Sequence, residues 1–314
     1  MSGETVQTTI TDWQEWVFHG DDVGPFLQNM CSQDILHQPE LSGRYGFFLR
    51  PQGRVIADAW IIRHDARTWP LWVHPVYRSL LERHLTLYRL RMDVSWDIRH
   101  RSGIWIGPLL TRDTAHLPET HIWIPLPWDT DRWCALGFPK LHVVDSVSVP
   151  DTPTLTPDDW HRQRRTVGWV WPAADIGLQD WMPLEAALYH GISYTKGCYV
   201  GQEVVAKATY IGHPPRRLMQ VRCHSWNPER FATPPSLAAD PHARPTFGWG
   251  PGVDPQTAIG WVWVPHTRRP VGTTVTLTWP DGTTLSGNLH VPEWCERIRA
   301  LYPPPTPPAQ GRQR

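Results

Sequence analysis

The sequence lacks a surplus of charge of either sign. Its 314 residues include 30 Lys and Arg against 30 Asp and Glu, so the formal net charge is zero. Phosphate neutralisation dominates the affinity of proteins for nucleic acid, and such proteins usually carry a basic surplus. The charge balance therefore argues against direct nucleic-acid binding, including RNA binding by stacking on the 20 tryptophans.

Long hydrophobic runs are also missing. A membrane-spanning helix needs roughly eighteen or more consecutive apolar residues, and the sequence has no such run. The segment Met1-Ser2-Gly3-Glu4 does not begin a basic stretch followed by an apolar one, as a secretory signal would. From these absences we expect a soluble protein without a membrane partner, located in the cytoplasm.

The cysteines do not form a recognisable framework. There are 5, their spacings are wide, and no Cys-x-x-Cys occurs, so neither a disulfide scaffold nor a zinc ribbon is indicated. Glycine-rich nucleotide loops, the Walker lysine loop, Gly-x-Ser-x-Gly and His-Glu-x-x-His are absent as well. We therefore expect no resident metal. Four of the cysteines are expected to be small buried hydrophobes, and Cys198 is set apart by its neighbours.

Periodic patterns predict alternating helices and strands in the first two thirds of the chain. Helical spacing of apolar residues indicates helices near 23–30 and 77–88, and Thr156 followed by Pro157 predicts a helix that begins there. Strand formers flank the turn Pro51-Gln52-Gly53 and recur at 69–73, 103–106 and 133–138. This pattern indicates a mixed α+β body.

The last third of the chain reads as an all-β unit. Strands are predicted at 217–223, 258–264 and 271–291, with a hairpin turn at Asp281-Gly282 and a long proline-rich loop over 225–257. Residues 301–314 are too rich in proline and polar residues to bury a core, so we expect a disordered tail. We thus predict a body over 1–215 and a barrel-like domain over 216–300.

One segment carries a specific resemblance. Residues 196–207 read Lys-Gly-Cys-Tyr-Val-Gly-Gln-Glu-Val-Val-Ala-Lys and resemble the signature of the YgfZ family. These folate-binding proteins of iron–sulfur cluster assembly and repair are related to the T-protein (aminomethyltransferase) of glycine cleavage. Residues 26–35 and the Gly53-Arg54 hairpin also resemble family motifs. The resemblance covers roughly 15–62 and 157–217, and at Lys207 the family usually has Arg.

The resemblance implies a fold, a ligand and a cellular role. The fold would be an α+β, T-protein-like three-domain cloverleaf: two intertwined subdomains in residues 1–215, and a C-terminal β-barrel. The ligand would be tetrahydrofolate. The protein would support assembly or repair of iron–sulfur clusters in client enzymes, including tRNA-modifying ones, and its partners would be iron–sulfur client or carrier proteins.

The resemblance also implies residues that would bind folate. A pterin presents adjacent N–H donors that match the two oxygens of a carboxylate, and Glu185 aligns with the Glu that related T-proteins use for this purpose. The alternative is a glutamate on a helix surface. An aromatic ring can stack on the pterin and cations can hold the glutamate tail. The cofactor-binding set is completed by Tyr199, Gln202, Lys207 and Arg165.

Cys198 is the candidate for chemistry on sulfur. It follows Lys196 by two residues and precedes a predicted helix start, and both features favour a thiolate, which iron takes as a ligand. One cysteine does not hold a cluster permanently, so ligation would be transient or shared with a partner. The alternative is a buried, inert thiol.

Two function classes remain. An aminomethyltransferase would pass a one-carbon unit to tetrahydrofolate, but the T-protein pattern Gly-Gly-x-x-x-Asp-Asp appears here as Gly53-Arg54-Val55-Ile56-Ala57-Asp58. One glycine and one acid of the pair are lost, and such transfer benefits from a carboxylate that orients the amine. We therefore favour a folate-dependent accessory protein over a conventional enzyme.

Overall fold

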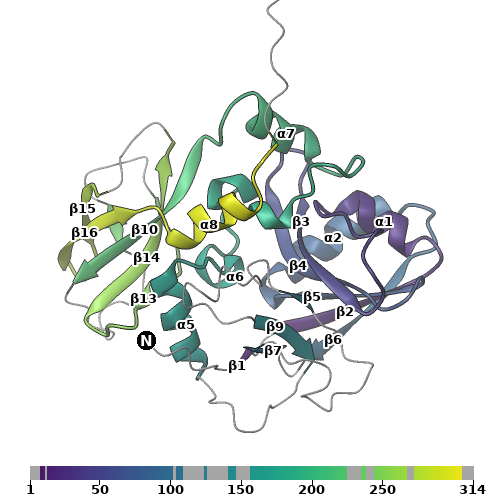
Figure 1. The fold of residues 1–314 in the computed structure, drawn as a ribbon, viewed down its shortest axis with the longest axis horizontal. Helices are drawn as coiled ribbons and strands as arrows, with labels where there is room; N and C mark the ends of the chain where they lie inside the picture. Colours follow the sequence, from purple (N-terminus) through teal and green to yellow (C-terminus); the bar gives the residue numbers. More distant parts are fainter. Residues whose placement is uncertain are drawn as a thin grey trace, which may run out of the picture. The chain divides into compact units, whose positions relative to one another are not determined.

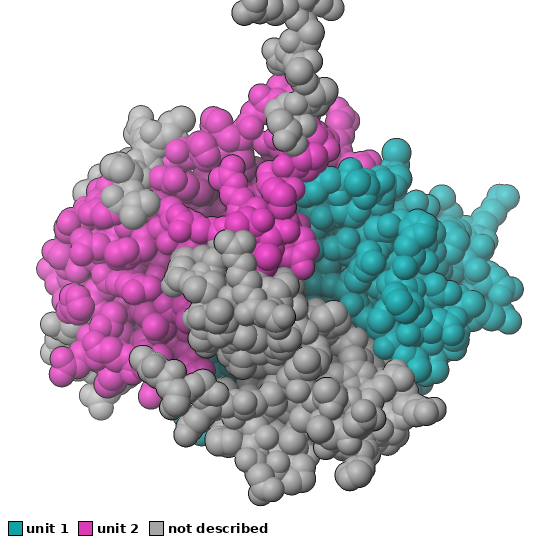
Figure 2. Space-filling model, in the orientation of Figure 1, with its two compact units in different colours: residues 1–50, 55–160, 190–200 teal, residues 51–54, 161–189, 201–314 magenta. Residues whose placement is uncertain are grey.

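The computed structural model describes residues 8–10, 13–101, 104–108, 124–125, 141–145, 156–224, 235–237, 244–266 and 272–305. The chain divides into two compact units (Figure 2). Unit 1 comprises residues 1–50, 55–160 and 190–200, and unit 2 comprises 51–54, 161–189 and 201–314. Each unit therefore consists of several separate segments of the chain. The domain boundary at residue 215 remains a prediction.

Unit 1 is built on a five-stranded antiparallel sheet with the order β3-β4-β5-β2-β6 (Figure 1). Its strands are β2 (Trp13–His19), β3 (Ser42–Leu49), β4 (Val55–Arg63), β5 (Thr68–Val73) and β6 (Ser95–Arg101). In β4, eight consecutive residues from Val55 are buried, so the strand is covered on both faces.

Two helices pack against this sheet, α1 (Val23–Met30) beside β5 and α2 (Arg78–Arg89) beside β4. Helix α1 begins after Asp22, whose carboxylate accepts the backbone N–H of Asp93 instead of capping its own helix. A short 3-10 turn, η1 (Pro75–Tyr77), leads into α2, whose buried face includes Leu81 and Leu85.

A smaller antiparallel sheet completes unit 1. Its strands follow the order β1-β7-β9-β8, with bounds Thr8–Ile10, Ile104–Pro108, Leu141–Asp145 and Ile124–Pro125. The edge pairing of β1 with β7 joins the first described residues to the strand at 104–108.

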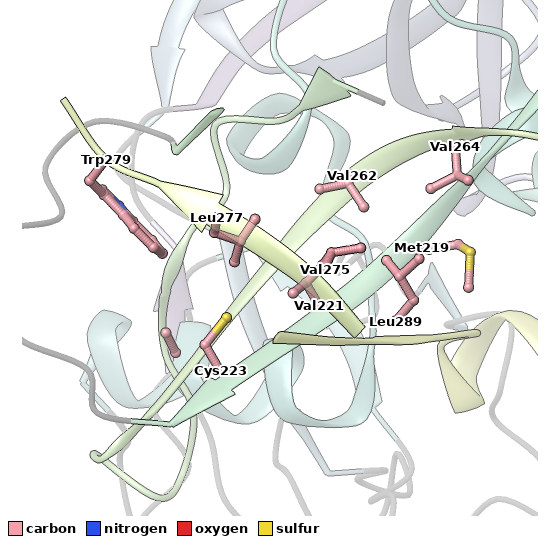
Figure 3. Close-up of a cluster of buried hydrophobic side chains, with 10 residues drawn as sticks. Met219, Val221, Cys223, Val262, Val264, Val275, Leu277, Trp279 and Leu289 are labelled. Carbon is pink, nitrogen blue, oxygen red and sulfur yellow. The ribbon is translucent and has the colours of Figure 1, made fainter. Parts of the chain in front are cut away.

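Unit 2 contains a curled seven-stranded sheet in the order β11-β15-β16-β10-β14-β12, with β13 also paired to β14. The strands are β10 (Arg216–His224), β11 (Ser236–Leu237), β12 (Arg244–Pro245), β13 (Gly250–Pro251), β14 (Thr257–Pro265), β15 (Thr274–Thr278) and β16 (Thr284–His290). Side chains from the four longest strands, among them Met219, Val262 and Leu289, form its core (Figure 3).

The helices of unit 2 are α5 (Pro157–Val167, of which 161–167 belong to this unit), α6 (Pro172–Asp175), α7 (Gln202–Tyr210) and α8 (Glu293–Leu301). Short 3-10 turns, η2 (Pro183–Ala186) and η3 (Tyr189–Gly191), follow α6 along the chain. The hydroxyl of Thr156 accepts the backbone N–H of Asp159 at 3.1 Å, which confirms the predicted cap of α5.

The predicted α+β class is confirmed, and most predicted elements are present. The sequence patterns did not predict β2 or α8, and the segment 133–138 lies outside the described residues. The predicted tail begins inside α8, since Leu301 is the last residue of that helix, and residues 306–314 lie outside the description. Among the described residues, no helix is both long and apolar enough to cross a bilayer.

Candidate functional site

The signature segment is anchored to the end of α1 by Lys196. The side chain is 8% exposed, and its Nζ donates to the backbone carbonyls of Gln28, Cys31 (2.8 Å) and Gln33 (2.9 Å). An ammonium has three protons, so these carbonyls use all of its donors. A cation is also favoured at the carboxyl end of a helix. Burial lowers the pKa of Lys196, and nearby Cys31 and Asp34 oppose this effect.

Two further contacts hold the same loop. The backbone N–H of Val200 donates to the carbonyl of Asn29 at 3.1 Å, and the Lys196 ammonium lies 5.1 Å from the ring centroid of Tyr199. Tyr199 is 7% exposed, so its ring is buried. Lys196 therefore uses all three of its N–H groups on backbone carbonyls, and its expected effect on the Cys198 thiolate remains a prediction.

Cys198 is exposed, whereas Cys31, Cys223 and Cys295 are buried. The alternative of a buried, inert thiol is thus wrong for this residue. A side chain added at the preceding Gly197 would meet no atom within 4 Å, so the loop projects into open space there. The geometry presents one thiol on a loop whose flanks are fixed to a helix.

Glu185 lies in unit 2, in η2, with a side chain that is 0% exposed. Its Oε2 accepts the Met182 backbone N–H at 2.8 Å and the Arg54 guanidinium at 3.2 Å. Arg216 donates to Oε1 at 3.1 Å and to Oε2 at 3.3 Å. The alternative of a surface glutamate is wrong, because this carboxylate is buried and neutralised by two arginines.

These contacts limit what the Glu185 carboxylate can bind. Oε2 already accepts three donors and Oε1 accepts one, so only Oε1 has room for another. A pterin that uses both oxygens therefore does not fit while Arg54 and Arg216 remain in place. Arg54 is 26% exposed and also lies 3.6 Å from the exposed carboxylate of Asp180.

The remaining predicted folate residues in unit 2 lie on two helices. On α7, Gln202 is half-buried and Lys207 pairs with Glu203 at 2.6 Å on an exposed face. On α5, the guanidinium of Arg165 donates to the Pro251 carbonyl at 3.3 Å. Their role in folate binding remains a prediction.

The run of basic residues at 161–165 predicts either cations for the folate tail or a solvated helix face. Arg164 instead lies 1% exposed in a two-point ion pair with Asp175, at 2.6 and 3.0 Å. Its Nε donates to Nδ1 of His161 at 2.7 Å. Burial and the neighbouring Arg164 and Arg165 lower the pKa of His161 to about 3, so the ring is neutral and able to accept. For Arg164, both expectations are wrong.

A buried acid with a shifted pKa lies on β4 of unit 1. The hydroxyl of Tyr45 donates to Asp58 at 2.9 Å, and the ring of His190 stacks on Tyr45 with centroids 5.0 Å apart. Burial raises the pKa of Asp58 to about 6, although hydrogen bonds from Tyr45 and Tyr77 oppose the shift. Asp58 is the acid that survives from the T-protein pattern, and the pattern itself gave no sign of this environment.

Within the described ranges, no three His, Cys, Asp or Glu side chains come together in a way that could hold a metal ion. A cluster that touches Cys198 would accordingly need ligands from elsewhere.

Several known proteins are similar to this chain in sequence. A mouse protein matches at 26% identity over 243 residues, 69% of this chain and 66% of its own length. A human protein matches at 25% identity over 277 residues, which is 77% of this chain and 68% of the human protein. A protein from Mycosarcoma maydis matches at 27% identity over 261 residues, which is 72% of this chain and 60% of that protein. The relatives are iron–sulfur cluster assembly factors. All three are described as IBA57 or its homologue, mitochondrial.

A solved structure resembles the fold. The glycine cleavage system aminomethyltransferase T from Bartonella henselae superposes with a TM-score of 0.66 at 14% identity, over 93% of this chain and 86% of its own. The predicted T-protein-like fold is thereby confirmed. No protein-family model matches the chain.

The comparisons also correct one expectation. Cytoplasmic localisation was inferred from the missing signal, but the assembly factors similar to this chain are described as mitochondrial. The chain spans only about two thirds of the length of the mouse and human relatives. The absence of a leader pattern at residue 1 therefore carried no information about compartment.

Proposed function

We propose that this chain is a tetrahydrofolate-binding assembly factor that supports the formation or repair of iron–sulfur clusters in client enzymes. The observation that carries the proposal is the exposed thiol of Cys198, on a loop fixed to α1 through Lys196 and Val200. Similarity to assembly factors of the same kind over 69–77% of the chain supports it.

In this proposal the cluster is cargo. Cys198 supplies one thiolate, which suits iron, and a carrier or client protein supplies the other ligands. A fixed loop reduces the conformational entropy lost when the thiol is presented to a partner.

Folate would bind through Glu185, Tyr199, Gln202, Lys207 and Arg165. Support comes from the resemblance of the signature segment and from the T-protein-like fold. The contacts of Glu185 add a requirement, since both guanidinium groups must leave Oε2 before a pterin can take the two oxygens. Each has a second partner at Asp180: the carboxylate for Arg54 and the backbone carbonyl for Arg216.

A complementation experiment tests the proposal. In a host that lacks its own factor of this kind, we expect the wild type to restore a cluster-dependent enzyme and Cys198→Ala to fail while remaining folded. Thr195→Ala is the matched control, because Thr195 is an exposed residue of the same loop. Full rescue by the cysteine variant would contradict the proposal. The same strains, assayed for tRNA modification, test whether tRNA-modifying enzymes are among the clients.

Aminomethyl transfer is the second candidate function, and Asp58 favours it. A buried carboxylate whose pKa is raised to about 6 is the kind of group that enzymes use to exchange protons near neutral pH. Purified protein, tetrahydrofolate and an aminomethylated carrier protein provide the assay. Rapid methylene transfer that Asp58→Asn abolishes would establish this activity. We expect no transfer.

A further inference from the structure

Unit 1 has a pocket that the proposed function does not use. Its volume is about 320 Å³, and it lies between α2 and the hairpin of β3 and β4. None of its lining residues belongs to the signature segment or forms a hydrogen bond with Asp58. The pocket is lined by Arg50, Ile56, Leu80, Arg83, His84 and Leu87.

The charged side chains that line this pocket are both positive. Arg50 and Arg83 are exposed, and in the part of the chain that the structure describes neither guanidinium has a hydrogen bond or an ion pair. No acidic side chain lines the pocket. A guanidinium offers parallel N–H donors that match a carboxylate or phosphate, so two of them facing one small pocket favour an anionic group.

His84 adds a polar group on the same wall. It is 9% exposed, and its Nε2 is sealed from solvent without a hydrogen-bond partner. Burial, reinforced by Arg50, lowers the pKa of His84 to about 4, so the ring is neutral at pH 7. A buried N–H without an acceptor is rarer and costlier than a buried acceptor without a donor. The proton is therefore assigned to Nδ1, which leaves that nitrogen as a donor.

The rest of the pocket is apolar. Ile56 forms part of its wall, and Leu80 and Leu87 are 37% and 69% exposed. Exposed leucines beside unpaired arginines match a ligand that has a charged head and an apolar body. The volume lies at the small end of the range of small-molecule sites, about 300–1,000 Å³.

We propose that this pocket binds a small organic anion with an apolar body. The carboxylate or phosphate head contacts Arg50 and Arg83, and the hydrocarbon part packs on Leu80 and Leu87. The small volume of this partly open pocket suits a small molecule better than a protein segment or a bilayer. This site is independent of Cys198 and Glu185, so the proposed function and this inference can fail separately.

Octanoate and octyl phosphate are the probes, and acetate and 1-octanol are the matched controls that lack the tail or the charge. Binding is followed by NMR, through the imidazole C–H of His84 and the methyl groups of Leu80 and Leu87. We expect saturable shifts with one or both anionic probes, and binding of acetate and octanol weaker by about tenfold or more. The stronger anion identifies the head group.

Variants locate the charge contacts. Arg50→Gln and Arg83→Gln should each weaken binding of the better probe by about tenfold, which is the loss of one charge-assisted contact. Arg78→Gln is the matched control, because Arg78 is an exposed arginine of α2 outside the pocket. It should change the affinity less than about twofold.

Three outcomes would overturn the inference. The first is an absence of saturable shifts with both anions. The second is an equal loss in Arg78→Gln, which would mean non-specific attraction. The third is binding to anionic phospholipid vesicles without binding of the monomeric probes, which would assign the surface to a membrane instead.

Discussion

The ammonium nitrogen of Lys196 lies 2.8 Å from the carbonyl oxygen of Cys31, at the carboxyl end of α1. This contact joins the signature segment to a helix more than 160 residues earlier in the chain. It separates the roles of two residues that are almost adjacent: Lys196 is buried and holds the loop, whereas Cys198 is exposed and available to a partner.

Replacement of Lys196 should therefore act on stability first. Lys196→Met removes three hydrogen bonds and leaves buried carbonyls unpaired, so we expect unit 1 to lose about 3 kcal/mol of unfolding free energy. Lys207→Met is the matched control, because Lys207 makes only an exposed pair with Glu203 in the same signature. Urea unfolding measures both variants. An unchanged midpoint for Lys196→Met would contradict the anchoring role.

Asp58 should give the protein a dependence of stability on pH. Its pKa is about 6 in the folded state and about 3.9 in an unfolded chain, so the folded state holds its proton more tightly. Below pH 4 the group is protonated in both states and has no effect. Stability falls as the pH rises from 4 to 6, and above pH 6 the full loss of about 3 kcal/mol is present.

Asp58→Asn removes this titration and keeps an oxygen that can accept from Tyr45. We expect the variant to gain stability relative to the wild type as the pH rises from 4 to 6, and the difference to stay constant up to pH 8. Urea unfolding at several pH values measures the difference. A difference that does not change with pH would show that Asp58 is not held in the protonated form.

Unit 2 should depend on the buried pair of Arg164 and Asp175. Removal of one partner leaves a buried charge uncompensated, so we expect Arg164→Met to lower the unfolding free energy of this unit by about 3–5 kcal/mol. Arg67→Met is the control, because Arg67 pairs with Asp21 on an exposed surface and should have little effect. Equal effects of the two variants in thermal unfolding would be inconsistent with this assignment.

Glu185→Gln tests the folate proposal. It removes the negative charge that a pterin edge would contact, and we expect the affinity for tetrahydrofolate to fall by about tenfold, or 1.4 kcal/mol. The variant also weakens the pairs with Arg54 and Arg216, so its thermal stability is measured in parallel. Asp21→Asn, which removes only the exposed partner of Arg67, should retain affinity within about twofold. Unchanged affinity in Glu185→Gln would remove this carboxylate from the site.

Local signals in the sequence predicted many elements correctly. Thr156 before α5 and Asp281-Gly282 between β15 and β16 each act within a few residues, and the structure has a helix start or a turn at each. Strand β2 was missed because Gln14 and Glu15 interrupt its apolar pattern. The carboxylate of Glu15 accepts the indole N–H of Trp72 at 3.2 Å, a contact made only after β2 and β5 pair.

In the candidate site, too, the sequence predicts some features, and others depend on tertiary contacts. Motif resemblance selected Cys198 and Glu185, but exposure and partners depend on contacts made over long sequence separations. Arg54 reaches Glu185 across 131 positions, and Arg164 is buried only because Asp175 neutralises it. A run of arginines predicts a solvated face when each residue is considered alone, and here the tertiary ion pair outweighs that tendency.

The most direct test of the central claim follows the ligands of the cluster itself. A cluster-loaded carrier protein is titrated anaerobically with the wild type and with Cys198→Ser, and the visible circular dichroism of the iron–sulfur centre is recorded. We expect the wild type to change the spectrum to a saturable new form, as a change of thiolate ligand requires. We expect the serine variant to leave the carrier's spectrum unaltered, and the same new form with both proteins would contradict a role for Cys198 as a cluster ligand.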